Sequence, residues 1–331
     1  MKEILNRLFE HQSLDKPTAK EILINLAKGE YNNSQVAAFL TVYLMRSITV
    51  DELEGFREAM LELCVPVDLS PYGVIDLCGT GGDGKNTFNI STLASFVTAG
   101  AGQPVAKHGN NSVSSVCGSS NVLAHFGYQF TNDVDKLKQS VEENGICFLH
   151  APLFHPAMKN VAPIRKELGV KTFFNMLGPM VNPAFPNKQL VGVFSLELAR
   201  LYGYLYQQLN KDFVILHSLD GYDEISLTAG FKAITKSGEK ILNPEDLQLS
   251  RHEEQDLAGG NSVEEAAEIF INILQGAGTK AQNEAVIANA AMAIQVGKYV
   301  DLPEAIAMAK ESLVSGNALE VFKKMIEHSQ K

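Results

Sequence analysis

Cysteine is scarce in this sequence, and its spacing suits neither a disulfide framework nor a zinc site. The 331 residues include four cysteines, and no two of them have Cys-x-x-Cys spacing: Cys64, Cys78, Cys117 and Cys147. Disulfide-rich domains and structural zinc sites depend on paired, regularly spaced cysteines. We therefore expect four reduced thiols in or near the core, and a cytoplasmic protein.

Positive charge and long apolar runs are scarce as well. The chain has 28 Lys and Arg residues against 38 Asp and Glu residues, which gives a net charge of −10. Nucleic-acid and anionic-membrane binders neutralise phosphates with clustered basic residues, so neither partner is expected. The longest apolar stretch, Val36–Met45, is interrupted by Thr41 and is shorter than the roughly 20 residues of a membrane span. Residues 1–12 mix charged and apolar side chains, so no signal peptide is expected either.

Length and periodicity predict two domains. A single core stops growing at roughly 250–300 residues, and this chain is longer. Residues 1–66 show helical periodicity only and are expected to form a small α-helical domain, with further helices from about 155–185 packed on it. Within it, Gln35–Met45 is apolar nearly all round, as in a helix buried inside an assembly. Residues 67–331 should form the second domain, with hinges near 66–73 and 171–186.

The chain from Val74 onward alternates short apolar runs with helical stretches. Strands are expected at 74–78, 105–106, 146–149, 190–194 and 213–217. Helices are expected at 87–99, from 122, and at 134–144, 156–168 and 196–209, followed by four more at 263–275, 282–296, 302–313 and 318–328. This alternation predicts crossover connections, and hence an α/β domain with a mostly parallel central sheet. The strands lack polar alternation, which indicates a sheet covered on both faces.

Glycine is concentrated in one part of the chain. Ten of the 26 glycines fall between Gly73 and Gly127, where an even spread would place about four. The densest run, Gly79–Gly84, lies between a predicted strand and a helix that begins near Asn89. Bare backbone amides beside a helix N-terminus can form an anion-binding concavity. The spacing matches neither G-x-x-x-x-G-K-[ST] nor G-x-G-x-x-G, and a merely tight turn remains the alternative.

A second loop of this kind opens with Lys107–Asn110, directly after the next predicted strand. It continues through Ser112, Ser114 and Ser115 to Gly118 and another helix start. The carboxyl ends of parallel strands share one edge of a sheet, so both loops should face one ligand with two phosphate groups. For His108 a purely structural role is the alternative.

Charged residues elsewhere could complete such a site. Asp223 and Glu224 are adjacent carboxylates in a turn that follows the strand ending at His217. Mg²⁺ typically binds one or two protein carboxylates together with substrate phosphates, although a solvated acidic turn is the alternative. Arg165, on a predicted helix, is either a surface charge or a clamp for a carboxylate, for which a guanidinium is well shaped.

Six motifs occur together in a recognisable order. They are G-T-G-G-D from Gly79, N-I-S-T, K-H-G-N, F-H-P-A-M, F-N-x-L-G-P-x-x-N-P and D-E-I-S ending at Ser226. In these motifs, and over most of its length, the chain resembles the anthranilate phosphoribosyltransferase family. The resemblance implies transfer of phosphoribose from 5-phosphoribosyl 1-diphosphate to the amino group of anthranilate. It also implies an α-helical and an α/β domain, two Mg²⁺ ions per subunit and a homodimer formed through the helical domain.

The resemblance also implies site residues. The phosphoribosyl donor would be bound by Gly79, Thr80, Gly82, Asp83, Thr87, Asn89, Ser91, Thr92, Lys107 and Ser119. Anthranilate would contact Gly79, His108, Asn110, His155, Arg165 and Gly178, with Arg165 on its carboxylate. Mg²⁺ would be held by Asp223 and Glu224, and Ser91 would reach a second ion through the donor. No catalytic residue is assigned, because positioning and stabilisation of the leaving diphosphate require no covalent nucleophile.

Four positions depart from the family pattern. Asn111 and Lys171 stand where arginine is common, and Asn121 and Ala124 replace an expected Asp and Glu. Loss of the arginine at position 111 removes a cation near the substrates. We interpret the changes at 121 and 124 as packing or surface changes.

Two other functions remain alternatives. A nucleoside phosphorylase of related architecture would need an S-G-R-G-type loop, which this sequence lacks, and would have no clear use for Asp223 and Glu224. A non-enzymatic relative that binds nucleic acid would need a basic face, which a net charge of −10 disfavours.

Overall fold

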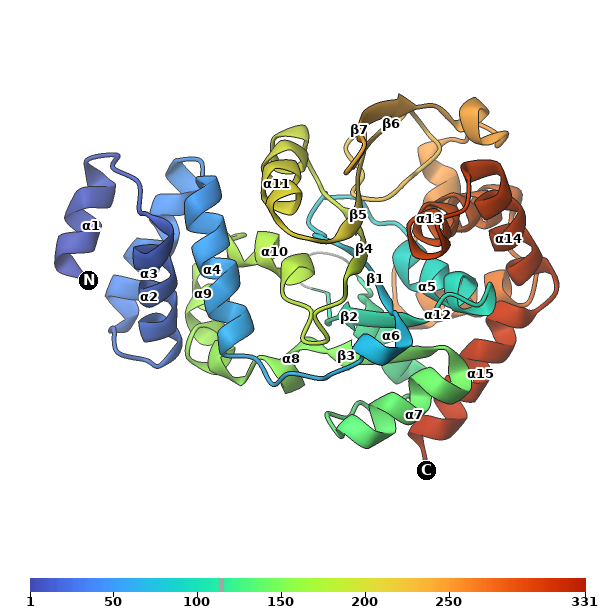
Figure 1. Ribbon diagram of the computed structural model, residues 1–331, viewed down its shortest axis with the longest axis horizontal. Coiled ribbons are helices and arrows are strands. Elements are labelled where there is room, and N and C mark those ends of the chain that lie inside the picture. The colour runs from blue at the N-terminus through green and yellow to red at the C-terminus, as the bar shows by residue number, and fades with distance from the viewer. Residues whose placement is uncertain (113–115) are drawn as a thin grey trace. The chain divides into compact units, whose positions relative to one another are not determined.

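The computed structural model describes residues 1–112 and 116–331, and the chain divides into two compact units (Figure 1). The helical unit comprises Met1–Pro66 and Ala151–Pro183. The sheet unit comprises Val67–His150 and Ala184–Lys331. Ser114 and Ser115 of the second predicted loop lie outside the described residues.

Short helices around an aromatic core form the helical unit. They are α1 (Lys2–Phe9), α2 (Lys16–Ala27), α3 (Asn33–Met45), α4 (Val50–Glu62), α8 (Ala151–Phe154), α9 (Ala162–Leu168) and α10 (Phe174–Leu177), with the 3-10 helices η2 (Pro156–Asn160) and η3 (Gly178–Met180). Phe56 and Phe173 stack with ring centroids 4.5 Å apart. Phe39 and Tyr43 of α3 pack edge-on against both rings. Edge-on and stacked pairs of this kind stabilise a core beyond their buried area.

One helix prediction is wrong in this unit. The expected continuous helix at 156–168 is two elements, because η2 ends at Asn160 and α9 starts at Ala162. Pro163 occupies the first turn of α9. Proline has no N–H to donate to the preceding turn and its ring clashes there, so a new helix begins instead.

A buried carboxylate, Glu52, ties three segments of the helical unit together. Its side chain is fully buried and forms an ion pair with Arg46. It also accepts hydrogen bonds from the backbone N–H of Leu14 at 2.9 Å, the hydroxyl of Tyr43 at 3.2 Å and the backbone N–H of Thr49 at 3.0 Å. Burial alone would raise the pKa of Glu52, but Arg46 and these N–H donors outweigh it and hold that pKa below its usual range.

The replacement Glu52→Gln should destabilise the helical unit by about 3 kcal/mol at pH 7, because it leaves the Arg46 guanidinium without its buried partner. The pKa of Glu52 is lower in the folded state than in the unfolded state, where it is about 4.3. The ionised Glu52 side chain therefore stabilises the fold above the unfolded-state pKa. This stabilisation is lost as the pH falls through the folded-state pKa. Chemical denaturation, with hydrogen exchange at Leu14 and Thr49, measures both effects.

The matched control is Glu62→Gln, which removes one of the two carboxylates that pair with Lys20 at the surface. That change should cost less than about 1 kcal/mol. Equal losses in the two variants, or an unchanged pH profile in Glu52→Gln, would contradict a buried tie at Glu52.

A seven-stranded sheet forms the centre of the sheet unit, in the order β3-β2-β1-β4-β5-β6-β7 (Figure 1). The strands are β1 (Ile75–Gly79), β2 (Val105–Gly109), β3 (Ile146–His150), β4 (Lys188–Gly192), β5 (Asp212–Ser218), β6 (Phe231–Thr235) and β7 (Gly238–Leu242). Strands β1 to β5 pair in parallel, and β6 and β7 add antiparallel pairs. The predicted fold class, a helical domain with a mostly parallel α/β domain, is confirmed.

Helices cover both faces of this sheet. Helix α5 packs on β1 and β2, α13 packs on β4 and β5, and α11 packs on β5 and β6 from the other side (Figure 1). The helices and 3-10 helices of this unit are η1 (Ser70–Tyr72), α5 (Ile90–Gly100), α6 (Ser119–His125), α7 (Val134–Asn144), α11 (Leu196–Gln208), η4 (Pro244–Leu247), η5 (Glu254–Leu257), α12 (Val263–Leu274), α13 (Lys280–Lys298), α14 (Leu302–Val314) and α15 (Asn317–Ser329). The central strands are therefore buried on both faces, which explains their uniformly apolar sequences.

The β6–β7 hairpin is not among the predicted strands. Strand β7 lies at the edge of the sheet and its residues are largely exposed, so it has no apolar run that would reveal it. The hairpin turns through Lys236 and Ser237, and Gly238 directly after them has a φ of +130°, which favours glycine.

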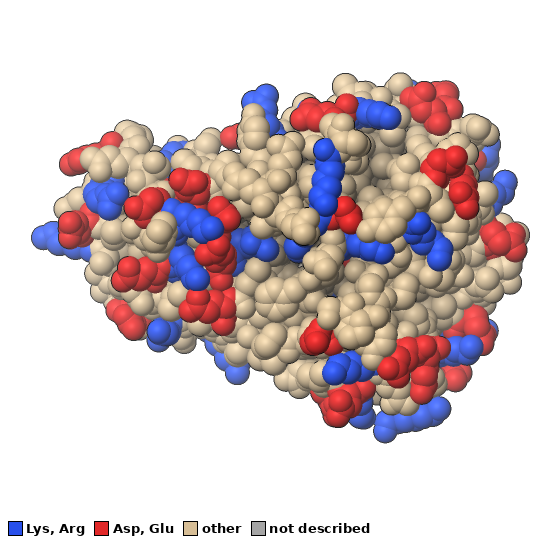
Figure 2. Space-filling view, viewed as in Figure 1, with Lys and Arg blue, Asp and Glu red and all other residues tan. Residues whose placement is uncertain are grey.

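Surface and thiol chemistry agree with the composition. The four cysteines are unpaired, as predicted, and three of them are buried. None of the helices in the described part of the chain combines the length and hydrophobicity needed to cross a bilayer. Figure 2 shows acidic and basic side chains interspersed on the face in view.

Candidate active site

The candidate site lies where the chain direction across the sheet reverses. After β1 the chain continues to β2 and β3 on one side, whereas β4 and β5 extend the sheet on the other. The carboxyl ends of β1 and β4 are in register, so that Gly79 lies opposite Gly192. Ligands of open parallel sheets bind outside such a reversal point, between the two diverging loops.

These two glycines make room for the acidic turn. A Cβ atom on Gly79 would overlap the carboxylate of Asp223, and a Cβ on Gly192 would overlap the backbone carbonyl of Asp223. The Asp223 Oδ2 atom in turn accepts a hydrogen bond from the backbone N–H of Gly81 at 2.7 Å. The turn after β5 is therefore held against the first glycine loop at the reversal point.

The second carboxylate lies at the start of α5. Glu224 Oε1 accepts a hydrogen bond of 2.8 Å from the backbone N–H of Ser91, in the first turn of that helix. Burial raises the pKa of Asp223, and the nearby Asp83 carboxylate raises it further. Burial and Asp223 raise the pKa of Glu224 in the same way. Like charges gathered in a buried place favour either protonation or a bound cation.

The chemistry of these donors fits Mg²⁺ bound together with a phosphate ligand. All are hard oxygen donors, which Mg²⁺ prefers. Within residues 1–112 and 116–331, no group of three His, Cys, Asp or Glu side chains is arranged to hold a metal ion. Two carboxylates leave most of an octahedral shell to water and phosphate oxygens, so the ligand would have to complete the site.

The first glycine loop is shaped for an anion. Gly81, Gly82 and Gly84 have φ values of +63°, +77° and +78°. The backbone N–H of Thr80 donates to the carbonyl of Gly192 at 2.9 Å, which fixes the beginning of the loop. The Thr80 hydroxyl and the Asn89 side-chain oxygen are buried without a hydrogen-bond partner among the described residues. Unpaired buried polar atoms are uncommon and often belong to a ligand site.

The segment 258–259, which was not predicted to belong to the site, contacts the end of this loop at residues 86–87. Thr87 forms an isolated antiparallel bridge with Ala258, and the backbone N–H of Gly259 donates to the carbonyl of Asn86 at 2.8 Å. A Cβ on Gly259 would overlap the backbone of Thr87. The Gly-Gly pair at 259–260 was the available signal, since it permits this close approach.

The second loop is joined to the first through Asn89 and Asp76. Asn89 Nδ2 donates to the carbonyl of Cys117 at 3.0 Å, and the fully buried Asp76 accepts from the backbone N–H of His108 at 3.1 Å. Within the loop, the carbonyl of Asn110 accepts from the Ser119 hydroxyl at 3.3 Å. Asp76 was not predicted, although a carboxylate in an apolar strand is itself a signal.

Lys107 is oriented toward the strand beside it. Its ammonium is buried and donates to the carbonyl of Leu77 at 2.6 Å. Burial lowers the pKa of Lys107, while neighbouring acids, including Asp76 and Glu224, act in the opposite direction. The charge therefore lies beside β1, at a residue two positions before Gly79.

The interpretation of Asn121 as a packing or surface change is wrong. Its Oδ1 atom accepts hydrogen bonds from the backbone N–H groups of Ser112 and Gly118, both at 3.0 Å. Asn121 thus closes the loop and caps the start of α6, a role for which Asn and Asp are suited alike. A short acceptor three residues into a helix was the signal for it.

Three predicted residues belong to the helical unit. Arg165, on α9, has its guanidinium carbon 5.1 Å from the ring centroid of Phe174, and its Nη2 donates to Asn175 Oδ1 at 3.2 Å. Burial lowers the pKa of His155 to about 4, so this imidazole is neutral at pH 7. Gly178 begins η3.

Asn289, on α13, is a further missed residue that positions the acidic turn. Its side chain accepts from the backbone N–H of Ile225 at 3.0 Å and donates to the carbonyl of the same residue at 2.9 Å. It also donates to the carbonyl of Ala285 at 2.9 Å. This fully satisfied amide fixes the backbone directly after Glu224. Its signal was a single polar residue within the apolar sequence of a buried helix.

The replacement Gly192→Ala should displace the acidic turn, because the new methyl group would overlap the backbone of Asp223. We expect a loss of about 2 kcal/mol in the free energy of unfolding and weaker Mg²⁺-dependent binding of inorganic diphosphate. Urea denaturation and calorimetric titration measure the two effects.

The matched control is Gly203→Ala on α11, where the added Cβ would meet Ile234 at an ordinary 3.6 Å. This variant should bind diphosphate normally and be as stable as the parent or slightly more so. Unchanged stability and diphosphate binding in Gly192→Ala would show that Gly192 is not needed to admit Asp223.

Comparison with known proteins identifies the family of this chain. The family model described as "Glycosyl transferase family, a/b domain" matches residues 71–319, and "Glycosyl transferase family, helical bundle domain" matches residues 2–64. The anthranilate phosphoribosyltransferase of Christiangramia forsetii is 60% identical over 100% of both chains. That of Flavobacterium psychrophilum is 62% identical over 98% of each chain.

Solved structures agree as well. The crystal structure of anthranilate phosphoribosyltransferase from Thermus thermophilus has a TM-score of 0.92 at 32% identity and covers 99% of each chain. The Saccharomyces cerevisiae enzyme in complex with PRPP and Mg has a TM-score of 0.90 at 28% identity, covering 98% of this chain and 96% of that one. Because close similarity in both sequence and structure extends over the whole chain, this protein belongs to the anthranilate phosphoribosyltransferase family.

Proposed function

We propose that this chain transfers the 5-phosphoribosyl group from 5-phosphoribosyl 1-diphosphate to the amino group of anthranilate, in tryptophan biosynthesis. The products are N-(5-phosphoribosyl)anthranilate and diphosphate. The observation that carries the proposal is the buried Asp223–Glu224 pair held between the Gly81 amide and the start of α5. A polyanionic donor bound with Mg²⁺ would satisfy that arrangement.

The sheet unit is proposed to hold the donor. Its residues for this role are Gly79, Thr80, Gly82, Asp83, Thr87, Asn89, Ser91, Thr92, Lys107 and Ser119. The loop amides and the N-terminus of α5 stabilise negative charge on the phosphates. Lys107, held against β1, adds positive charge without leaving its contact with Leu77.

Mg²⁺ is proposed to bind at Asp223 and Glu224, with a second ion near Ser91. When bound, the metal supplies charge stabilisation for the departing diphosphate. Asp223 and Glu224 would bind it as carboxylates, and Gly81 and Ser91 fix their orientation through backbone N–H groups. The structure of the Saccharomyces cerevisiae relative in complex with PRPP and Mg supports the choice of ion.

Anthranilate is proposed to contact Gly79, His108 and Asn110 in the sheet unit, and His155, Arg165 and Gly178 in the helical unit. The half-buried Arg165 guanidinium, stacked near Phe174, is suited to a carboxylate on an aromatic ring. An aromatic amine is nucleophilic while neutral, and a neutral His155 adds no competing positive charge. In the transfer, the ribose C1–oxygen bond breaks, a C1–nitrogen bond forms, and the amine releases a proton.

We also propose a cytoplasmic homodimer formed through the helical unit. This unit exposes four large apolar side chains, Phe9, Leu44, Met45 and Val170, and exposed apolar groups of this size often mark interfaces. The chain passes between the two units at residues 66–67, 150–151 and 183–184. We propose the segments near 66–73 and 171–186 as hinges.

Incubation of the protein with anthranilate, phosphoribosyl diphosphate and Mg²⁺ should consume anthranilate and remove its fluorescence. The initial rate of this loss should be proportional to the enzyme concentration. Omission of the diphosphate donor or of Mg²⁺ should prevent the loss. Absence of any fluorescence change with folded protein would contradict the proposed function.

The same assay tests the anthranilate contact. Arg165→Ala should raise the KM for anthranilate about tenfold or more, because a charge-assisted hydrogen bond is lost, and change the KM for the donor little. Arg200→Ala, an exposed arginine on α11, is the matched control and should change neither constant. Equal increases in both KM values for Arg165→Ala would argue against a carboxylate clamp.

A further inference from the structure

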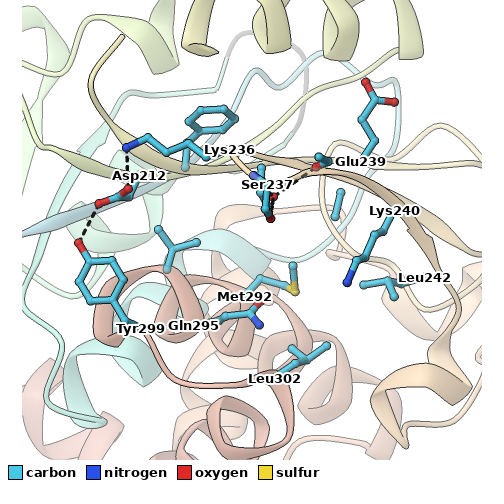
Figure 3. Close-up of a pocket in the computed structure, with 15 residues that line it drawn as sticks. Asp212, Lys236, Ser237, Glu239, Lys240, Leu242, Met292, Gln295, Tyr299 and Leu302 are labelled. Carbon is cyan, nitrogen blue, oxygen red and sulfur yellow. Dashed lines mark hydrogen bonds and ion pairs between the residues drawn. The ribbon is translucent and has the colours of Figure 1, made fainter. Parts of the chain in front are cut away.

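A cavity lies in the sheet unit beside the start of strand β5 (Figure 3). The acidic turn follows the opposite end of the same strand. The β6–β7 hairpin forms one side, and the end of α13 with the start of α14 forms the other. Its volume is about 420 Å³. Small-molecule sites commonly have volumes of about 300–1,000 Å³, so this cavity is large enough for a ligand of modest size.

The floor of the cavity is apolar. Met292 from α13 and Phe213 from β5 are almost fully buried there. Leu242 from β7 and Leu302 from α14 complete it, and Figure 3 shows Met292 between Leu302 and the hairpin turn at Ser237. A ligand with a flat hydrocarbon body would bury its apolar surface against this floor. Such burial is the usual source of affinity in small-molecule pockets.

Among the described residues, Lys240 is the one charged side chain lining the cavity that has no counter-charge. Lys236 Nζ donates to Asp212 Oδ1 at 2.8 Å, and Glu239 forms an ion pair of 2.5 Å with Lys232. Lys240 makes no ion pair or hydrogen bond through its side chain with any described residue. Figure 3 shows the Lys240 ammonium directed toward the cavity floor. In a chain of net charge −10, this is an uncompensated positive charge above an apolar surface.

A neutral polar group accompanies this charge. The side-chain amide of Gln295 lines the same cavity, one helical turn after Met292, and has no hydrogen-bond partner in the part of the chain that the structure describes. An amide offers one donor and one acceptor group. Together with Lys240 it could orient a polar head, while the floor accepts an apolar body.

The wall opposite Lys240 is preformed. Tyr299 ends α13 with a φ of +57°, which is uncommon for a residue with a side chain. Its hydroxyl donates to Asp212 Oδ2 at 2.7 Å, and Lys188 Nζ lies 4.9 Å from its ring centroid. These contacts hold the ring in place although it is largely exposed. A preformed wall lowers the ordering cost of binding a ligand.

We propose that this cavity binds a small organic monoanion with a flat apolar body. The anionic head, a carboxylate or sulfonate, lies beside the Lys240 ammonium and the Gln295 amide, and the body covers Met292. A phosphate dianion is disfavoured, because one free cation cannot replace the hydration of two negative charges. None of these residues belongs to the proposed transferase site, so the cavity is a separate binding site.

The test uses 2-naphthoate as the probe and the full chain with methionine methyl groups labelled with carbon-13. The chain has nine methionines, and a Met292→Leu variant assigns the resonance of Met292. Titration should shift the Met292 methyl resonance saturably. Lys240→Ala should weaken this binding by about fivefold, the upper range for a solvent-exposed ionic contact.

Lys310→Ala is the matched control, because Lys310 is an exposed lysine on α14 that does not line the cavity. It removes the same charge and should leave the affinity unchanged. The proposal is overturned if Met292 shows no saturable shift, if Lys240→Ala and Lys310→Ala weaken binding equally, or if the probe shifts only the methionines of the helical unit. The titration does not measure transferase activity, so its outcome is independent of the proposed transferase function.

Discussion

The site depends on the absence of two side chains at neighbouring strand ends. Gly79 and Gly192 lie opposite each other at the carboxyl ends of β1 and β4, and the Asp223 turn fills the space that their side chains would occupy. Any larger residue at Gly192 would overlap the main chain of that turn. The register of two parallel strands therefore decides where the carboxylates lie, and with them where a cation and a phosphate ligand can bind.

Electrostatics at the site follow from this packing. Carboxylates that are crowded out of water have raised pKa values and favour a cation. Around them, the chain offers backbone N–H groups from a glycine loop and a helix start, and the buried charge of Lys107. An acidic protein can thus bind a polyanion locally, because the charges that matter are within a few ångströms of it and the net charge is spread over the whole surface.

Much of the fold could be predicted because its signals are local. Strands β1 to β5 are short apolar runs followed by glycine or polar residues, and α7 has the bounds expected from its sequence. The β6–β7 hairpin could not be predicted, because an exposed edge strand needs no apolar face. The break near Pro163 was visible in the sequence, but helical periodicity on both sides concealed it.

The candidate site was likewise predictable only where its signals are local in the sequence. Its glycine loops and adjacent acids could be recognised from motifs, whereas Gly192 and Asn289 act through strand register and a contact between distant segments. Asn121 was misread because its role depends on the path of the loop that it closes. Sequence order alone contains neither register nor loop path, so these partners required the three-dimensional structure.

We propose that the acidic turn admitted by Gly79 and Gly192 forms the cation site for the donor. Calorimetric titration of phosphoribosyl diphosphate, with and without Mg²⁺, tests it most directly when Asp223→Asn is compared with Asp220→Asn, an exposed acid in the same turn. Mg²⁺ should strengthen donor binding in the parent and in Asp220→Asn but not in Asp223→Asn. Equal strengthening in all three proteins would contradict it.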